Sequence, residues 1–518
     1  MEFISIFNDV LGPVMRGPSS SHTAGSFRIG KIAASLLGEE IGSAEFSFDP
    51  DGSYAKTYRQ QAADLAFAAG ILGIKITVDK FKSSLEIADK NGIKIEFNIS
   101  PIKNADHPNT VKIEMTGRKG KELTAIAKST GGGGILFTYL NDWTVQLTGK
   151  SFEILVESDI NTEPEIIKLL TSDKEITVLP ERKVVEDSVL IFIQRMSAVS
   201  QEILLKVKKL PGVKKIWNSD PVFFVKRGEE KFSSAEEMIR FSEENNYSLG
   251  KAALVYESTL LGISEKQALD EMIRRYEIMK FSVTSGLNDK NVKMKILNPS
   301  AEQIFKSESE GRLPFGGTHT RAAARTLAAM HISNSLGVVC AAPTAGSAGV
   351  LPGVIVTLEE EKKLGIENIA LSLFAASAVG LIVAKRATFA AEVAGCQVEI
   401  GAAGAMAAAA VIEASGGSVK QALDAAAISF QNTMGSVCDL VQGLCEIPCH
   451  TRNAAAASNA FLMADLVIGG YENPIPLDET IDAVYSVGKL LPPELRCTSL
   501  GGIAVTPSAL NLNKIRRN

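Results

Sequence analysis

The chain has 518 residues, of which 45% are hydrophobic and 22% are charged, a balance typical of a globular protein with a large core. Its formal net charge of −5 excludes the strongly basic surface typical of nucleic-acid-binding proteins. The longest apolar run, residues 369–384, is shorter than the ~20 residues that cross a bilayer. We therefore expect no nucleic-acid partner and no membrane partner, and length alone suggests about three domains.

The first segment, MEFISIFNDVLGPVMRG, has neither the basic start nor the apolar centre of a secretion signal. We therefore expect a cytoplasmic protein. In that reducing compartment cysteines serve as ligands or catalytic groups more often than as disulfides.

Residues 1–150 predict a mixed α/β lobe. Alternating apolar and polar residues predict half-buried strands, and helical spacing predicts helices. The expected helices are 26–38 and 57–69, the expected strands are 111–117 and 144–149, and STGGGGILF is an expected glycine-rich turn.

Residues 151–225 predict a second domain with the order β-α-β-β-α-β, the split βαβ arrangement of ferredoxin-like domains. The six elements are expected at 151–158, 163–172, 175–184, 188–196, 200–210 and 213–219. The segment KKLPGVKKIW resembles an ACT regulatory domain, but the first strand-to-helix turn, DINTEP, lacks the glycine usual there. Effector binding and a purely structural or dimerising role both stay open.

Residues 230–518 predict an almost entirely helical third domain. Helical spacing is clear at 235–245, 265–279, 320–332 and 421–430. Glycine-rich segments, APTAGSAGVLPG and GCQVEIGAAGAM, interrupt this alanine-rich pattern. Such breaks mark either close helix packing or a site.

All six cysteines follow residue 339, and three of them stand in segments bounded by glycine, proline or polar residues: Cys396, Cys438 and Cys449. Three thiolates can hold an iron–sulfur cluster with one iron left open as a Lewis acid. A free cysteine is also a common small core residue, and neither a ferredoxin-type run nor CxxC is present. From the residues alone, a thiolate site and simple packing both stay open.

The segment GPSSSHTAG places five polar side chains directly before a predicted helix: Ser19, Ser20, Ser21, His22 and Thr23. Hydroxyls and free backbone N–H groups at the positive end of a helix dipole form a site for a carboxylate or a phosphate. The alternative is an ordinary N-cap, but one serine suffices for a cap. STGGGG, with Ser129, Thr130, Gly131 and Gly132, is either a second anion nest or a tight turn.

Over nearly its whole length the chain resembles the iron–sulfur-dependent L-serine dehydratases. The segments that carry the resemblance are GPSSSHTAG, HPNTVKI, STGGGG, APTAGSAGVLPG, GCQVEIGAAGAMAAAA, CDLVQGLCEIPCHTRNA and ELRCTSLGGIAVTP. Many members have separate β and α chains, and here the same order is fused. The resemblance implies an α+β protein with three parts: a β-type catalytic lobe (1–150), an ACT-like domain (151–225) and an all-α cluster-binding domain (230–518).

The resemblance further implies that Cys396, Cys438 and Cys449 hold a [4Fe–4S] cluster and that Cys340, Cys445 and Cys497 do not. Some single-chain relatives have a C-terminal cysteine that reaches the cluster, and NLNKIRRN has none. The implied partner is a small amino-acid substrate, and we expect a homodimer.

By the same resemblance, the enzyme removes the Cα proton and the hydroxyl of serine, and the product rearranges and hydrolyses to pyruvate and ammonia. The SSSHT and STGGGG segments would hold the carboxylate and amine, with His22 as the catalytic group. Arg452 and Asn453 would bind substrate near the cluster.

Three departures leave the substrate open. Where the family has a GHGTD-like stretch after KTYR, this chain has Gln60 and Gln61, and a glutamine cannot act as a base. Leu440 replaces a proline after the second cysteine, and MKILNPSAEQ replaces a Gly-Gly-Asp segment. The alternatives are elimination from another β-hydroxy acid or from cysteine, or a catalytically degenerate amino-acid or redox sensor.

Overall fold

A computed structural model describes residues 3–103, 105–288 and 292–515. The chain divides into two compact units. The α/β unit is Gly25–Arg227, and the helical unit combines Met1–Ala24 with Gly228–Asn518. The prediction of a mixed α/β protein with an N-terminal sheet region and a C-terminal helical region is therefore confirmed.

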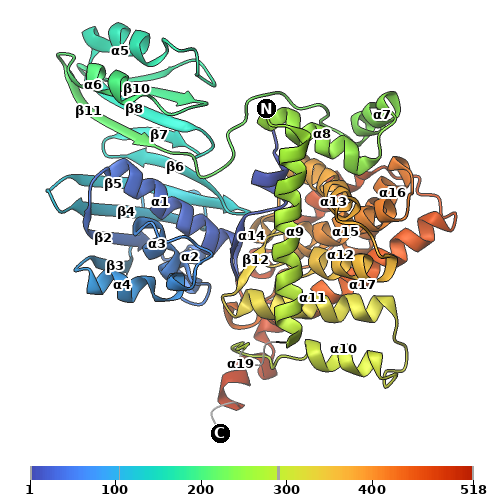
Figure 1. Cartoon of the computed structure of the whole chain (residues 1–518). Coiled ribbons are helices and arrows are strands. Elements are labelled where there is room, and N and C mark those ends of the chain that lie inside the picture. The colour runs from blue at the N-terminus through green and yellow to red at the C-terminus, as the bar shows by residue number, and fades with distance from the viewer. Residues whose placement is uncertain (1–2, 104, 289–291, 516–518) are drawn as a thin grey trace. The chain divides into compact units, whose positions relative to one another are not determined.

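The α/β unit contains a six-stranded sheet in the order β3-β2-β4-β5-β6-β7, in which only β2 and β3 are parallel. Helices α1 and α3 pack together, and α1 lies on β5 (Figure 1). The strands of this sheet are β2 Ile41–Phe48, β3 Lys94–Ile99, β4 Thr110–Gly117, β5 Glu122–Gly131, β6 Gly134–Leu140 and β7 Trp143–Leu147. Its helices are α1 Gly25–Leu37, α2 Ser53–Thr57, α3 Ala63–Ile71 and α4 Ser84–Lys90.

One expected helix of this unit is broken. Residues 57–69 were predicted as continuous, but residues 58–62 form turns between α2 and α3. Ala62 adopts a left-handed conformation with φ of 55°, and the N–H of Ala63 bonds to the carbonyl of Tyr58. This bond pattern closes a helix end, so the altered Gln60-Gln61 segment lies in a turn.

A four-stranded antiparallel sheet in the order β11-β8-β10-β9 completes the α/β unit. With two helices it has the predicted order β-α-β-β-α-β: β8 Phe152–Asp159, α5 Glu163–Leu170, β9 Glu181–Val185, β10 Ser188–Arg195, α6 Gln201–Lys208 and β11 Val213–Ser219. Strand β9 is shorter than expected. Pro180 precedes it, and a proline cannot donate to a strand ladder.

Alternation along β8 and β10 buries both faces of the four-stranded sheet. Ile154 and Val156 join one core with Ile166 of α5, whereas Leu155 joins the core that contains Phe46 of the six-stranded sheet. The ferredoxin-like order is therefore observed, while an ACT-type function stays a prediction.

The helical unit is built around alanine-rich helices, as predicted. Small side chains allow close approach: a Cβ added to Gly404 would lie 3.3 Å from the Cβ of Ala456. The helices are α7 Ala235–Asn245, α8 Leu249–Leu261, α9 Glu265–Asn288, α10 Ala301–Ser309, α11 Thr318–Asn334, α12 Val350–Lys362, α13 Ile366–Arg386, α14 Ala391–Ala394, α15 Ile400–Ala414, α16 Val419–Thr433, α17 Cys449–Ile468, α18 Leu477–Leu490 and α19 Pro507–Ile515.

Within the described residues, two helical segments are long and apolar enough to cross a membrane, Ile366–Arg386 and Cys396–Ala414. Their most apolar windows are 78% and 89% buried inside the protein. Packing against other helices therefore accounts for their apolar composition.

The first 24 residues belong with the helical unit, although the sequence grouped them with the α/β lobe. Strand β1 (Val14–Arg16) pairs with β12 (Val338–Cys340). The buried carboxylate of Glu257 accepts hydrogen bonds from Ser5 Oγ at 2.6 Å and from the N–H of Ile6 at 2.8 Å. These contacts place the SSSHT segment in the same unit as the cysteines.

Candidate functional site

The three predicted ligand cysteines come from the starts of helices and from one loop. Cys396 begins a short helical turn (Cys396–Val398) that leads into α15, and Cys449 is the first residue of α17. Cys438 lies in the segment that follows α16. All three are at most 3% exposed.

The Cys396 turn is fixed by the buried Gln397. Its Nε2 donates to the carbonyl of Ala394 at 2.9 Å, and its Oε1 accepts from the N–H of Gly435 at 2.9 Å. Gly395 has φ of 77°, and a Cβ there would lie 2.7 Å from the carbonyl oxygen of Ser436. Only glycine fits this approach, so the turn before Cys396 is locked onto the segment that precedes Cys438.

The thiols of Cys396 and Cys438 are in hydrogen-bond contact, and Cys449 is close enough to act electrostatically on Cys396. Contact with Cys438, together with burial, raises the pKa of Cys396 well above its usual value. Iron binding would therefore have to displace protons from this buried pair.

The donor type of the three cysteines suits an iron–sulfur cluster, because such clusters are held by soft thiolate ligands. Within the described residues, no three His, Cys, Asp or Glu side chains are grouped closely enough to hold one metal ion.

Arg452, one turn along α17 from Cys449, faces Cys396. Its Nη1 lies 3.8 Å from the sulfur of Cys396, donates to the carbonyl of Val437 at 2.7 Å and is 3.0 Å from Asp439 Oδ1. The guanidinium therefore supplies a positive charge beside the thiol of Cys396, and the role of Arg452 in substrate binding stays a prediction.

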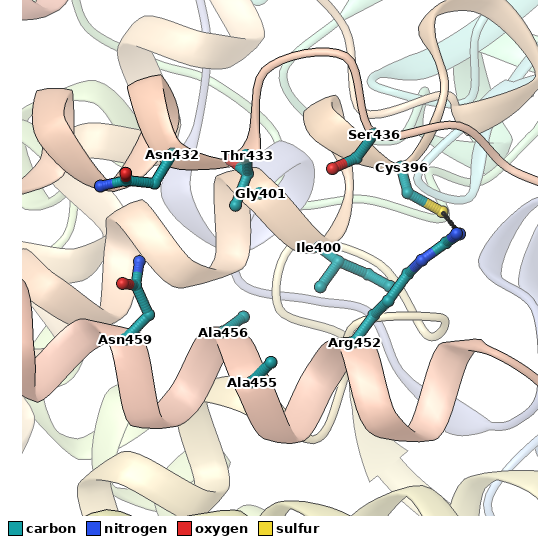
Figure 2. A pocket seen from close by; sticks show the side chains of 10 residues that line it. All are labelled: Cys396, Ile400, Gly401, Asn432, Thr433, Ser436, Arg452, Ala455, Ala456 and Asn459. Atoms are coloured by element: carbon teal, nitrogen blue, oxygen red, sulfur yellow. Dashed lines mark hydrogen bonds between the residues drawn. The ribbon is translucent and has the colours of Figure 1, made fainter.

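A pocket of about 340 Å³ opens beside Cys396. Figure 2 shows that Arg452, Ala455 and Asn459 line it from α17, opposite Asn432 and Thr433. The bond from Arg452 to the sulfur of Cys396 closes one end. The pocket is large enough for a small molecule.

Asn453 connects the cysteine region to the APTAGSAG segment. It is fully buried, and its Nδ2 donates to the carbonyls of Gly346 and Cys449 at 2.9 and 2.8 Å. Its Oδ1 is buried without a hydrogen-bond partner among the described residues. An unsatisfied buried amide oxygen is costly, and a bound donor such as an ammonium group would satisfy it.

Glu399 is a site residue that the sequence did not indicate. Its carboxylate accepts a hydrogen bond from Thr344 Oγ1, and a Cβ added to Gly346 would meet its Oε1 at 2.6 Å. Burial raises the pKa of Glu399 to about 7. Its place three residues after Cys396 was visible, but its contact with APTAGSAG is long-range and carries no sequence signal.

The SSSHT segment contacts the same region. Ser20 Oγ accepts from the N–H of Ala345 at 3.0 Å, and Ser21 Oγ donates to Glu392 Oε1 at 3.2 Å. Ser19 Oγ is 3.3 Å from Nδ1 of His22. Burial lowers the pKa of His22 to about 3, so its imidazole is neutral at physiological pH.

The STGGGG segment lies in the α/β unit, and its role in the site stays a prediction. It forms the turn between β5 and β6, with Gly131 and Gly132 at φ of 98° and 58°. Arg28 Nη1 donates to the carbonyl of Gly133 at 2.6 Å, and Ser129 Oγ is buried without a hydrogen-bond partner among the described residues.

The remaining cysteines divide into two groups. Cys340 lies in β12 and contacts Arg275. By contrast, Cys445 contacts the thiol of Cys449, and Cys497 contacts the thiol of Cys438. The sequence gave no indication of these two contacts, since 59 residues separate the second pair along the chain.

Known proteins match this chain in both of its regions. The family model described as serine dehydratase alpha chain matches residues 182–504. The probable L-serine dehydratase alpha chain of Bacillus subtilis is 34% identical over 283 residues, covering 55% of this chain and 94% of that relative. The corresponding beta chain of Bacillus subtilis is 44% identical over 157 residues, covering 30% of this chain and 69% of that relative.

A third relative, whose name carries no chain designation, also matches. The L-serine dehydratase of Helicobacter pylori strain 26695 is 29% identical over 286 residues, covering 53% of this chain and 62% of that relative. The chain therefore belongs to the L-serine dehydratase family, a family of lyases, and its similarity to both an alpha and a beta chain is consistent with a fusion.

Proposed function

We propose that this protein converts L-serine to pyruvate and ammonia with the help of a [4Fe–4S] cluster held by Cys396, Cys438 and Cys449. The observation that carries the proposal is that three buried thiols occur in one unit with Arg452 beside Cys396 and Asn453 bonded to the backbone of Cys449 and Gly346. The SSSHT segment is bonded to Ala345 of the same APTAGSAG loop. When bound, such a cluster with one iron free of protein ligands supplies Lewis acidity at the hydroxyl that leaves.

The chain's own residues would bind and orient the substrate. The hydroxyl of Ser20 accepts from Ala345, so its hydrogen can be donated to the serine carboxylate. Ser19, Ser21, Thr23 and the STGGGG turn are the further carboxylate or amine contacts that the sequence suggests. The unsatisfied Oδ1 of Asn453 suits the substrate ammonium group, because an ammonium offers three donors.

His22 is our candidate for the group that removes the Cα proton. If Nδ1 carries a hydrogen that is donated to Ser19 Oγ, Nε2 is the basic atom. Loss of that proton and of hydroxide gives an enamine, which tautomerises to an imine and hydrolyses to pyruvate and ammonia. Burial lowers the pKa of His22 to about 3, so the imidazole is neutral before the reaction but is a weak base in this surrounding.

A second candidate function keeps the fold but changes the substrate. Gln61 is 6% exposed in the turn between α2 and α3, where the family resemblance implies a histidine. A neutral amide there favours another β-hydroxy acid, or cysteine, as the substrate, or a degenerate sensor. Under the first proposal Gln61→His should raise serine turnover, whereas a rebuilt pocket should leave it near zero.

The test is an oxygen-free assay of the full chain with L-serine, L-threonine and L-cysteine in parallel. We expect pyruvate from L-serine at the highest kcat/KM. Sulfide and pyruvate from L-cysteine, with no turnover of L-serine, would replace the proposal with the second function. Iron-loaded protein inactive on all three would support a sensor.

A further inference from the structure

Cys497 and Cys438 contact each other through their backbones and through their side chains. The N–H of Cys497 donates to the carbonyl of Cys438 at 2.8 Å, and the N–H of Cys438 donates to the carbonyl of Leu495 at 2.8 Å. Cys438 and Arg496 form a parallel β-bridge. The two sulfur atoms are themselves in hydrogen-bond contact, so paired backbone segments hold the thiols together.

Cys497 has a rare backbone conformation, which the contacts around it hold in place. Its φ is 62°, in the left-handed region that residues other than glycine rarely adopt. Such a conformation persists only where surrounding contacts impose it. Ser499 nearby has φ of 58°, and its Oγ donates to the carbonyl of Leu440 at 2.7 Å. The segment is therefore bonded both to Cys438 and to Leu440, two residues later.

The two thiols differ in access. Cys438 is only 2% exposed, whereas Cys497 is partly exposed. Cys396, the other neighbour of Cys438, is 1% exposed. Of these three thiols, Cys497 is therefore the one nearest to solvent, although burial raises its pKa to about 11. A thiol near solvent beside a second thiol is an arrangement from which thiol–disulfide exchange can proceed.

We propose that Cys438 and Cys497 form a reversible disulfide in the cluster-free protein, with a low-molecular-weight disulfide as the oxidant. The thiolate of Cys497 attacks that disulfide, forms a mixed disulfide and expels one small thiolate. The thiolate of Cys438 then attacks the Cys497 sulfur and expels the second. Two protein thiols lose two protons and two electrons, and one small disulfide becomes two small thiols.

The disulfide would take Cys438 out of the ligand set until a reductant restores it. This consequence rests on the proposed function, whereas formation of the bond does not. The pair would protect a ligand thiol from the irreversible oxidation states of cysteine while no cluster covers it.

The test uses the full chain. Its iron is removed with a chelator under oxygen-free conditions, and the protein is then treated with oxidised glutathione. After alkylation and digestion, mass spectrometry should find the Cys438 and Cys497 peptides joined. The absence of a Cys438–Cys497 linkage, whether both thiols are free or Cys438 is instead joined to Cys396, would overturn the proposal. This result needs no variant and does not depend on cluster binding.

Iron uptake then tests the consequence. Oxidised wild-type protein should fail to bind iron and sulfide until dithiothreitol is added, whereas oxidised Cys497→Ser should bind them without reductant. Cys340→Ser is the matched control and should behave as the wild type does. A Cys438–Cys497 bond in protein that never binds iron would sink the proposed function but leave the disulfide standing.

Discussion

The hydroxyl of Ser20 accepts a hydrogen bond from the N–H of Ala345 at 3.0 Å, and both residues are buried. The contact joins a segment near the N-terminus to the loop that also contacts Asn453 and Glu399. Because a buried hydrogen bond fixes relative position as well as adding stability, the SSSHT segment is held beside the cysteine region before any substrate binds.

Asn453→Ala should weaken substrate binding more than folding. It removes two hydrogen bonds, each worth about 1 kcal/mol, and also the unsatisfied Oδ1 that we assign to the substrate amine. We expect KM for L-serine to rise while the iron content stays unchanged. Asn459→Ala, on the same helix within the pocket, is the control, and equal KM values for the two variants would refute the assignment.

His22→Ala should lower kcat by at least about 100-fold, because positioned acid–base groups contribute ~10²–10⁴-fold in rate. Iron content and KM should change little. Single-turnover measurements with α-deuterated serine would show whether proton removal has become slower. If turnover stays near that of the wild type, the base comes from the cysteine region, where Glu399 stands beside Thr344.

The pH dependence of kcat/KM distinguishes His22 from Glu399 as the base. His22, with a pKa lowered to about 3 by burial, stays neutral as pH falls through the neutral range. If it is the base, kcat/KM should not decline on the acid side near neutrality. The pKa of Glu399 is raised to about 7 by burial. A decline as pH falls through about 7, absent in Glu399→Gln, would therefore assign the base to Glu399.

Glu153 predicts a pH-dependent stability of the α/β unit. Burial raises its pKa to about 7, although Thr148 and Gly149 donate backbone hydrogen bonds to it. The folded state thus keeps a proton that the unfolded state releases, so stability should fall as pH rises from about 4.5 to 7. The full cost is on the order of 3 kcal/mol.

Glu153→Gln should remove this cost and be stabilising above pH 7 relative to the wild type. Tryptophan fluorescence during urea unfolding reports on the correct unit, because the chain's two tryptophans, Trp143 and Trp217, both lie there. Glu165→Gln, which removes an exposed carboxyl of α5, is the control. An equal gain at acidic and alkaline pH would show that the proton on Glu153 is not responsible.

Local patterns in the sequence predict most elements but not their long-range contacts. Helical spacing at 320–332 and strand alternation at 111–117 correspond to α11 and β4, because burial of one face imposes those periods. The break at residues 58–62 was missed because Arg59, Gln60 and Ala62 are not helix breakers. The pairing of β1 with β12 was missed because it joins residues more than 300 positions apart.

In the candidate site, too, local sequence patterns mark some residues, whereas other residues are identified only by long-range contacts. The glycine and proline setting of Cys396 and Cys449 marks them in the sequence, since a turn or a helix start must present each thiol. Glu399 and Cys497 carry no such mark. Their significance comes from contacts with Thr344 and Cys438 that only the fold creates.

The most direct test of the account measures iron and pyruvate together in a matched pair of cysteine variants prepared without oxygen. Cys396→Ser should lose both bound iron and pyruvate formation from L-serine, whereas Cys340→Ser, which alters an equally buried cysteine away from the predicted ligands, should keep both. Full activity of Cys396→Ser, or of iron-free wild-type protein, would contradict the claim that this lyase works through a cluster held by Cys396, Cys438 and Cys449.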